Sequence, residues 1–340
     1  MILPAPSALP PSRQPEAPPA VVASEPDLGS CPAIVITTSW DDGHPQDLRL
    51  AELLEAYQIP ATFYIPKANP LDDLPVMSEA EIRGLSRRGF EIGAHTMDHV
   101  VLTRASDAVV RRELAESKAW VEGLTGGPCS VFSPPNGKFA ARHVDMIREA
   151  GFAGFRTTEM WSLDRPRPRH DGLLELPTTL QAQAQPMSGT LRNLMKRCAV
   201  GNTVKFLRFG RGSRWMDHAE AVLDHVLAEG RGVFHLWGHS WELEEADQWG
   251  RLERVLARMR SVSRRAALLN NSELCTGRSL TAFRGAVRGA DPGAGAGRGD
   301  LAPRRAAARP GLPAGVDASC GTAPGRRWPT TGRARGPVHG

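Results

Sequence analysis

The chain has 340 residues, 41% of them hydrophobic and 23% charged, a composition that excludes an intrinsically disordered protein. The formal net charge is +5, but eleven Arg and three Asp lie after residue 275, so the preceding part carries about −3. The sequence pI near 9.2 therefore describes the C-terminal stretch, and we expect no nucleic-acid partner for the folded part.

Composition divides the chain into three zones. Residues 1–30 are rich in Pro, Ala and Ser and are predicted to be a disordered leader, and residues 276–340 are predicted to be a disordered tail rich in Arg, Gly, Ala and Pro. Residues 31–275 carry the regular patterns of one domain. The five Cys are scattered and are expected to be reduced thiols. We see no signal peptide and no membrane span, so the predicted location is cytoplasmic; the oligomeric state is not predicted.

Short apolar runs alternate with amphipathic stretches through the middle zone. The predicted strands cover residues 33–37, 61–65, 90–94, 130–133, 153–157, 173–176 and 232–237. The predicted helices cover residues 47–57, 78–87, 108–124, 140–150, 216–228 and 247–259. This alternation predicts parallel strands joined by crossover helices. About seven such units favour a barrel-like α/β fold, with an open doubly wound sheet as the alternative.

Four polar clusters follow predicted strands, where parallel α/β folds place their working residues. They are SWDDGH (39–44), HTMDH (95–99), SPPNGK (133–138) and HLWGHSWE (235–242). Each motif alone is a weak signal, because DDG and SPPNG are also ordinary turn sequences. Their joint occurrence at strand ends predicts a functional site.

The first two clusters contain the donors of a hydrolytic metal site. His95 and His99 are four residues apart, so on a helical turn they would face one direction and bind one ion. Two His and one carboxylate leave coordination positions open for water. Of the adjacent Asp41 and Asp42, one is expected to bind the metal while the other accepts a proton. Gly43 allows the tight turn that this loop needs.

The motifs SWDDG, HTMDH, FSPPNG and GHSWE resemble those of the polysaccharide deacetylases, carbohydrate esterase family four, with their nodulation-type chitooligosaccharide deacetylase homology domain. The resemblance covers residues 31–275 and implies a distorted seven-stranded (β/α) barrel. It implies a metal-dependent hydrolase in which metal-bound water removes an N-acetyl group from an amino sugar. By this resemblance Asp41 is the catalytic base, and Asp42, His95 and His99 hold a divalent metal, usually zinc.

The resemblance also implies a general acid and a substrate-binding region. His239 matches the general acid best, and His235 is the second choice. Whichever of the two is not the acid is interpreted as a neutral histidine of the core. Backbone N–H groups near Pro135 and Asn136 are expected to stabilise an oxyanion. Trp241 is a candidate for stacking on a sugar, together with Trp237 and Trp249, although packing is the plainer interpretation of all three. Glu242 either orients His239 or faces solvent.

Two departures from the family pattern stand out. Ser133 occupies the position of an Arg that holds the catalytic Asp; Arg156 or Lys138 are candidates to replace it, although Arg156 is equally interpreted as a surface partner of Glu159. The fourth motif has no clear match, with Trp161 and Asp164 nearest.

These departures leave two alternatives open. One is a deacylase acting on a non-sugar amide, such as a formamide or an imide. The other is a carbohydrate-binding barrel that has lost turnover. With a cytoplasmic location, the expected sugar substrate is a precursor glycan or a short oligosaccharide.

Overall fold

A computed structural model of the chain describes residues 32–70, 73–169, 172–183, 200–210 and 214–276. The predicted leader, the tail after Thr276, and the residues Cys31, Cys198 and Cys320 lie outside this part. The two described cysteines, Cys129 and Cys275, are buried free thiols.

All seven predicted strands are present and lie parallel in the order β7-β5-β4-β3-β2-β1-β9. The last long strand, β9, pairs with the first, β1, as in a barrel. The strands are β1 (Ile34–Asp41), β2 (Thr62–Ile65), β3 (Glu91–Ala94), β4 (Val131–Phe132), β5 (Gly154–Arg156), β7 (Leu174–Leu176) and β9 (Gly232–Gly238).

The described part of the chain contains three short strands that were not predicted, so the predicted count of seven was too low. β6 (Arg167–Pro168) is antiparallel to β7, β8 (Leu180–Gln181) extends the sheet beyond β9, and β10 (Ala267–Leu268) pairs with the first half of β1. Two-residue strands show no periodicity that a sequence pattern can detect. The ten-stranded mixed sheet has β6 and β8 at its ends and curls into a half-barrel, which confirms the predicted α/β barrel class.

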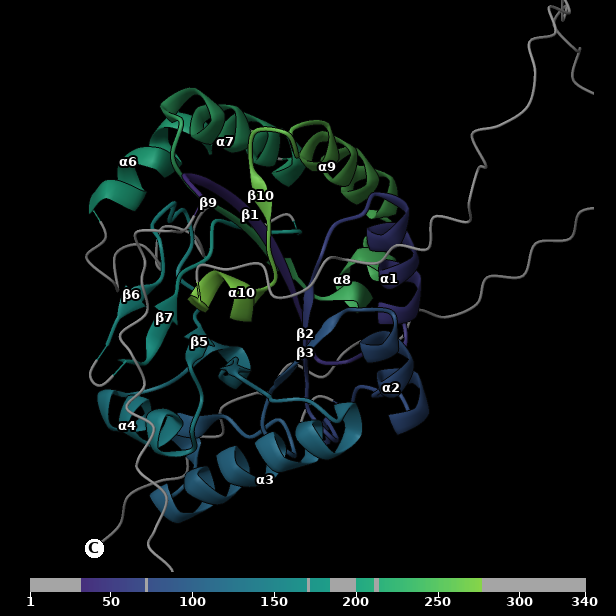
Figure 1. The fold of residues 1–340 in the computed structure, drawn as a ribbon, viewed down its shortest axis with the longest axis vertical. Helices are drawn as coiled ribbons and strands as arrows, with labels where there is room; N and C mark the ends of the chain where they lie inside the picture. Colours follow the sequence, from purple (N-terminus) through teal and green to yellow (C-terminus); the bar gives the residue numbers. More distant parts are fainter. Residues whose placement is uncertain (1–31, 71–72, 170–171, 184–199, 211–213, 277–340) are drawn as a thin grey trace, which may run out of the picture. The chain divides into compact units, whose positions relative to one another are not determined.

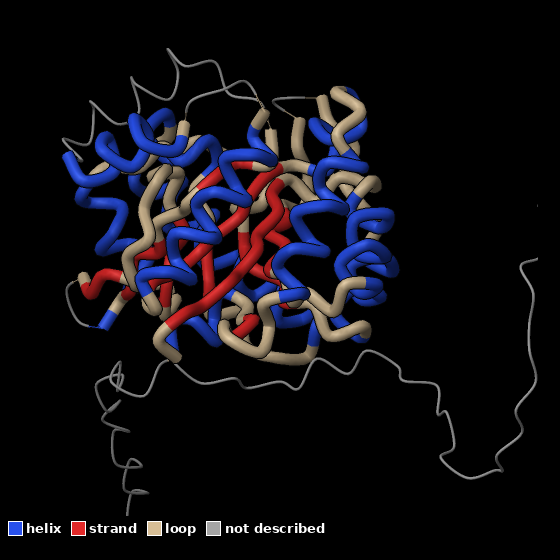
Figure 2. The backbone as a smooth tube through the Cα atoms, turned by 90° about the horizontal axis from the view of Figure 1, so that it is seen from above, coloured by secondary structure: helices blue, strands red, loops and turns tan. Residues whose placement is uncertain are grey.

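Helices surround the curled sheet (Figures 1 and 2). The six predicted helices are α1 (Asp47–Ala56), α2 (Glu79–Arg87), α3 (Asp107–Thr125), α4 (Ala141–Glu149), α7 (Trp215–Glu229) and α9 (Trp249–Ser261). Within the described ranges, five helical segments were not predicted: η2 (Leu102–Arg104), η3 (Pro135–Gly137), α6 (Val200–Phe209), α8 (Ser240–Glu245) and α10 (Asn271–Thr276). Of the helices in the described ranges, none has the length and apolarity to cross a bilayer.

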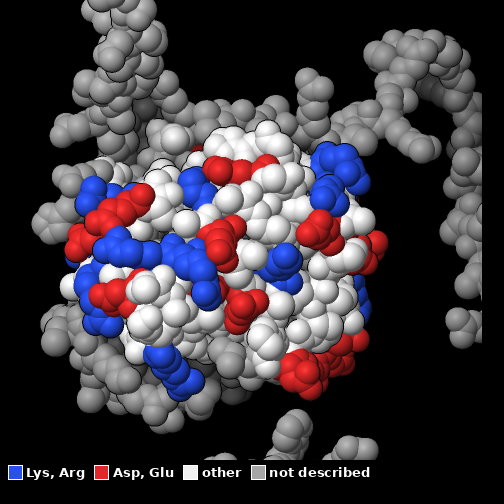
Figure 3. Space-filling model, turned by 90° about the horizontal axis from the view of Figure 1, so that it is seen from below, with Lys and Arg blue, Asp and Glu red and all other residues white. Residues whose placement is uncertain are grey.

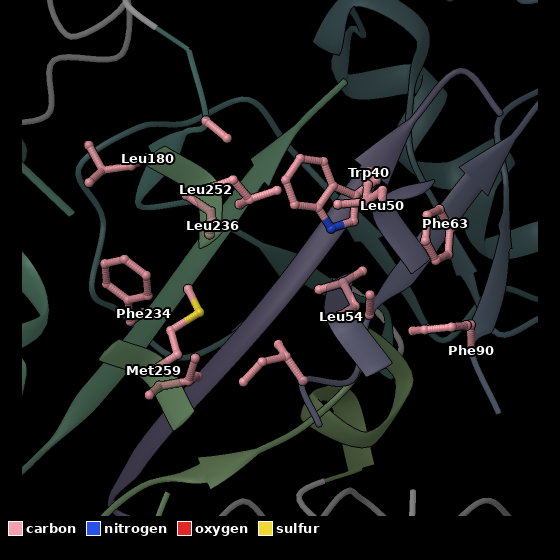
Figure 4. Close-up of a cluster of buried hydrophobic side chains, with 14 of the residues drawn as sticks. Trp40, Leu50, Leu54, Phe63, Phe90, Leu180, Phe234, Leu236, Leu252 and Met259 are labelled. Atoms are coloured by element: carbon pink, nitrogen blue, oxygen red, sulfur yellow. The ribbon is translucent and has the colours of Figure 1, made fainter. Parts of the chain in front are cut away.

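The hydrophobic core has two parts. The larger one lies between the sheet and the outer helices, where Trp40, Leu50, Leu54 and Phe63 are fully buried (Figure 4). The smaller one fills the interior of the half-barrel and consists of Val35, Tyr64, Val131, Leu174, Leu176, Val233, Leu269, Leu274 and Cys275.

Helix α10 lies inside the ring of strands (Figure 1) and contributes the last two of these core residues. Its first backbone N–H groups, at Asn271 and Ser272, donate to Glu91 Oε2 at 3.0 and 3.2 Å. Asn271 is further bound to Tyr64 and Thr37 inside the barrel. This network fixes the interior of the barrel, while the polar motifs follow the carboxyl ends of its strands.

Charged residues of both signs are interspersed on the face shown in Figure 3. Exposed ion pairs such as Arg142–Asp107, with 2.9 Å between Nε and Oδ1, contribute to this mixed character of the described surface.

Candidate metal and catalytic site

The side chains of Asp42, His95 and His99 form one buried cluster, as the sequence predicted. Asp42 Oδ1 lies 3.6 Å from His95 Nε2 and 3.2 Å from His99 Nε2. Tetrahedral ligands about 2.0–2.1 Å from a zinc ion lie about 3.3 Å from each other. The three donor atoms, all within 4.8 Å of one another, therefore fit one divalent ion and leave a position open.

A strained turn after β1 places Asp42. Asp42 has φ 78° and Gly43 has φ 62°, both in the left-handed region. A Cβ atom at position 43 would lie 2.5 Å from Ile65 Cγ2, so only glycine fits there. The predicted role of Gly43 in a tight turn agrees with this geometry.

The HTMDH motif does not form the helical turn that its spacing suggested. Residues 95–99 form a loop after β3, with Thr96 at φ 63° and His99 at φ 52°. These left-handed residues, and not an i,i+4 helix face, bring the two imidazole centroids to 5.1 Å. His95 Nδ1 binds the Ser133 carbonyl oxygen at 2.6 Å, which directs its Nε2 into the cluster.

Asp41 is held by an arginine from β5. Arg156 Nη2 is ion-paired with Asp41 Oδ2, and the guanidinium carbon lies 4.6 Å from the centroid of the Trp237 ring. Asp41 Oδ1 is buried and has no hydrogen-bond partner among the described residues. One carboxylate oxygen is thus fixed and the other is available to accept a proton.

This geometry decides between the candidates for the missing arginine. Arg156 is buried at the place where the family's Arg is expected to act, and Lys138 is exposed. The interpretation of Arg156 as a surface partner of Glu159 is wrong, because Glu159 binds Arg167 with both carboxylate oxygens at 2.8 Å.

His239, at the N-cap of α8, faces the cluster. Its Nε2 lies 3.8 Å from Asp42 Oδ2, and its Nδ1 lies 2.7 Å from Glu242 Oε2. Burial disfavours the imidazolium, but the bond to Glu242 and the charge of Asp42 outweigh it and raise the pKa of His239 to about 9. Glu242 is only 12% exposed and also accepts from Gln181 Nε2, so its solvent-facing interpretation is wrong.

His235 lies inside the barrel, away from solvent. Its Nε2 is 2.9 Å from Ser39 Oγ and its Nδ1 is 3.1 Å from the Pro177 carbonyl oxygen. Burial, helped by the nearby Arg156 charge, lowers the pKa of His235 to about 3. Both ring nitrogens are engaged and the ring is neutral, which matches the core histidine expected for one of the two candidates.

The indole of Trp241 binds a candidate metal ligand, a contact that the sequence analysis missed. Trp241 Nε1 donates to Asp42 Oδ2 at 3.0 Å, on the oxygen opposite the two histidines. Trp241 is half-buried. Trp237 and Trp249 are buried and pack against Arg156 and Arg49. No spacing rule predicts a contact between residues 199 positions apart.

The third motif forms the short helix η3 at the carboxyl end of β4. Pro135 is buried, whereas Asn136 is exposed and left-handed at φ 58°. A Cβ atom on Gly137 would clash with Thr158, so the shape of this turn depends on that glycine.

The two candidates for the fourth motif, Trp161 and Asp164, lie in the core and in a surface ion pair, respectively. Trp161 is buried against Phe206, with ring centroids 5.4 Å apart. Asp164 Oδ2 accepts from Arg167 Nη2 at 2.8 Å. Neither contact involves the Asp42, His95 and His99 cluster.

Fold and site together define an α/β half-barrel whose parallel strands carry a buried Asp–His–His cluster and a second, arginine-held Asp at their carboxyl ends. Residues 29–155 match the family model described as polysaccharide deacetylase. The resemblance expected from the four motifs is therefore confirmed for the part that holds Asp41, Asp42, His95 and His99.

A curated protein is similar to part of the chain. Over 134 residues the chain is 28% identical to the peptidoglycan-N-acetylglucosamine deacetylase of Bacillus cereus, covering 38% of this chain and 56% of that one. The chain thus spans little more than half the length of that curated relative.

Solved structures share the fold. One is the Mycobacterium smegmatis protein titled "putative polysaccharide deacetylase", with a TM-score of 0.54, 18% identity and coverage of 78% of this chain and 99% of that one. Another is Puue allantoinase, with a TM-score of 0.55, 14% identity and coverage of 76% and 94%.

Proposed function

We propose that this protein is a metal-dependent hydrolase that removes the N-acetyl group from an amino sugar of a glycan precursor or oligosaccharide. One observation carries the proposal. Asp41 precedes Asp42 in the sequence, and its buried Oδ1 has no hydrogen-bond partner in the described structure, whereas Asp42 forms the candidate metal cluster with His95 and His99. The similarity to a peptidoglycan-N-acetylglucosamine deacetylase supports the choice of substrate class.

Asp42, His95 and His99 would hold the divalent metal, and their nitrogen and carboxylate donors suit zinc. When bound, the ion supplies Lewis acidity and lowers the pKa of water. Asp42 has no oxygen left for proton transfer, because Oδ1 faces the two histidines and Oδ2 binds Trp241. The base must therefore be its neighbour.

The remaining residues divide the proton transfers between them. Asp41 accepts a proton from water through Oδ1 while Arg156 keeps Oδ2 in place. His239, protonated through its bond to Glu242, gives a proton to the leaving nitrogen of the amide. The backbone N–H at Asn136, on the exposed turn η3, donates to the carbonyl oxygen as negative charge develops.

The structure weakens one reason for the non-sugar alternative. The absence of Arg at position 133 put the usual substrates in doubt, but Arg156 makes the expected contact with Asp41 from another strand. The lost-turnover alternative is weakened as well, because a carbohydrate-binding barrel has no use for the available Asp41 oxygen.

A substrate panel tests the proposal. N-acetylglucosamine oligomers, an N-formyl amine and a cyclic imide are incubated with the zinc-supplemented wild type, Asp41→Asn and the surface control Asp164→Asn. We expect acetate release by the wild type and the control, and a loss of about 10²-fold or more in Asp41→Asn. Turnover of only the formyl or imide compound favours the non-sugar deacylase. Oligomer binding without any product favours the binding barrel.

A further inference from the structure

A buried carboxylate outside all four motifs holds the loop that joins the two histidine ligands. Glu113 belongs to α3, which packs against β3 and lies between α2 and α4 in Figure 1. Its Oε2 accepts hydrogen bonds from the backbone N–H of Met97 at 2.9 Å and of Asp98 at 3.3 Å. Glu113 is 1% exposed, so these bonds are shielded from water.

The loop needs such an anchor because its own backbone is strained. Thr96 and His99 are both left-handed, a conformation that costs non-glycine residues free energy and persists only when surrounding contacts enforce it. β3 ends at Ala94, so the residues between the histidines lie beyond the strand pairing of β3, and the backbone bond from Ala68 N–H to the Met97 carbonyl oxygen at 2.9 Å reaches the same loop from the other side of the peptide unit. Within the loop, Thr96 Oγ1 accepts from Val100 N–H at 2.9 Å.

We propose that Glu113 is a positioning residue for the metal: it fixes the backbone between His95 and His99 so that both Nε2 atoms meet at one ion. This inference rests on the proposed metal-dependent function. Glu113 acts through the two N–H groups midway between the imidazoles. On its other oxygen, Oε1, the carboxylate is balanced by Arg112 Nη2 at 3.3 Å.

The chain offers a matched control for the burial of a carboxylate. Glu175 in β7 is 2% exposed and binds Arg169, whose side chain is 47% exposed. Glu113 is equally buried and pairs with Arg112, whose side chain is 58% exposed. Both carboxylates are buried and ion-paired, but of the two only Glu113 contacts the ligand loop. A comparison of variants at Glu113 and Glu175 therefore distinguishes a general loss of stability from a loss of positioning of the metal ligands.

The test measures Zn²⁺ affinity of the full chain by competition with a chromophoric chelator, together with the visible spectrum of the Co²⁺ form. We expect Glu113→Ala to bind Zn²⁺ about 10- to 100-fold more weakly, the loss that follows removal of supporting partners behind metal ligands. The Co²⁺ bands should shift or weaken as well. Glu113→Gln, which keeps an acceptor oxygen of the same reach, should stay within a few-fold of wild type, as should Glu175→Ala.

If Glu113→Ala does not fold, Glu113→Asp replaces it, since its shorter carboxylate cannot reach both N–H groups and should still weaken Zn²⁺ binding. Wild-type affinity and an unchanged Co²⁺ spectrum in the folded Glu113→Ala or Glu113→Asp protein would overturn the positioning role and leave the proposed function standing. A wild type that binds no metal would overturn both.

Discussion

Arg156 and Asp41 form an ion pair inside the barrel, where their side chains are 1% and 7% exposed. The pair joins β5 to the end of β1 across 115 residues of sequence. A buried pair adds little net stability over apolar packing, but removal of one partner leaves an uncompensated charge. The main role of the pair is therefore to fix the orientation of Asp41, the proposed base.

Loss of Arg156 should impair both stability and turnover. We expect Arg156→Ala to lower the free energy of unfolding by about 3 kcal/mol or more, because it leaves the buried Asp41 charge uncompensated, and to lower kcat, because Asp41 Oδ2 is no longer held in place. Arg156→Lys should be intermediate, since Lys lacks the planar face that stacks on Trp237. Denaturant unfolding and steady-state kinetics check this. The exposed-pair control Arg142→Ala should change stability by less than about 1 kcal/mol.

His239 should titrate at high pH in the metal-free protein. With its pKa raised from 6.5 to about 9, its stabilising interaction with Glu242 is fully present below pH 6.5 and is lost as the pH rises through about 9. Histidine NMR should show this midpoint, and Glu242→Gln should lower it. Added Zn²⁺ should also lower it, because a cation beside Asp42 disfavours imidazolium. An ordinary midpoint in the metal-free wild type would contradict the interaction.

The two candidate histidines should separate into a structural and a catalytic residue. His235→Asn loses at least one of the bonds to Ser39 and Pro177 and should destabilise the fold by roughly 1–3 kcal/mol, with turnover of the folded protein within a few-fold. His239→Asn should keep Zn²⁺ but lose about 10²-fold or more in the kcat of the folded protein. Thermal melts and steady-state kinetics distinguish the two, and the reverse pattern would exchange the assignments.

Trp241 should support the metal ligand and the substrate by different parts of its ring. Trp241→Phe removes the donor to Asp42 Oδ2 but keeps an aromatic face, so Zn²⁺ affinity should fall by about 10-fold while KM changes little. Trp241→Ala should additionally raise KM. Chelator competition and kinetics measure the two effects. An unchanged Zn²⁺ affinity in Trp241→Phe would show that the indole bond is dispensable.

The sequence predicted the barrel and the members of the site because strand periodicity is local and parallel strands bring their carboxyl ends together. It named Arg156 only as one of two candidates to hold Asp41, left the role of Glu242 open, and missed the contact of Trp241 with Asp42. The Arg156–Asp41 and Trp241–Asp42 pairs depend on strand register and side-chain direction, which no spacing encodes.

The HTMDH spacing suggested a helix, but left-handed Thr96 and His99 fold it as a loop held by Glu113. In the sequence, nothing distinguishes the buried Glu113 from the exposed Glu residues that are common on helices. The cytoplasmic location, the disordered leader and the disordered tail stay predictions.

Metal content of the wild type and of His95→Ala is the most direct test of the central claim. Both proteins are loaded with Zn²⁺, passed over a desalting column and analysed by elemental mass spectrometry, with Glu175→Ala as a control for altered burial. We expect about one Zn²⁺ per chain in the wild type and the control, and little in His95→Ala. No bound Zn²⁺ in the wild type, or equal amounts in all three, would contradict it.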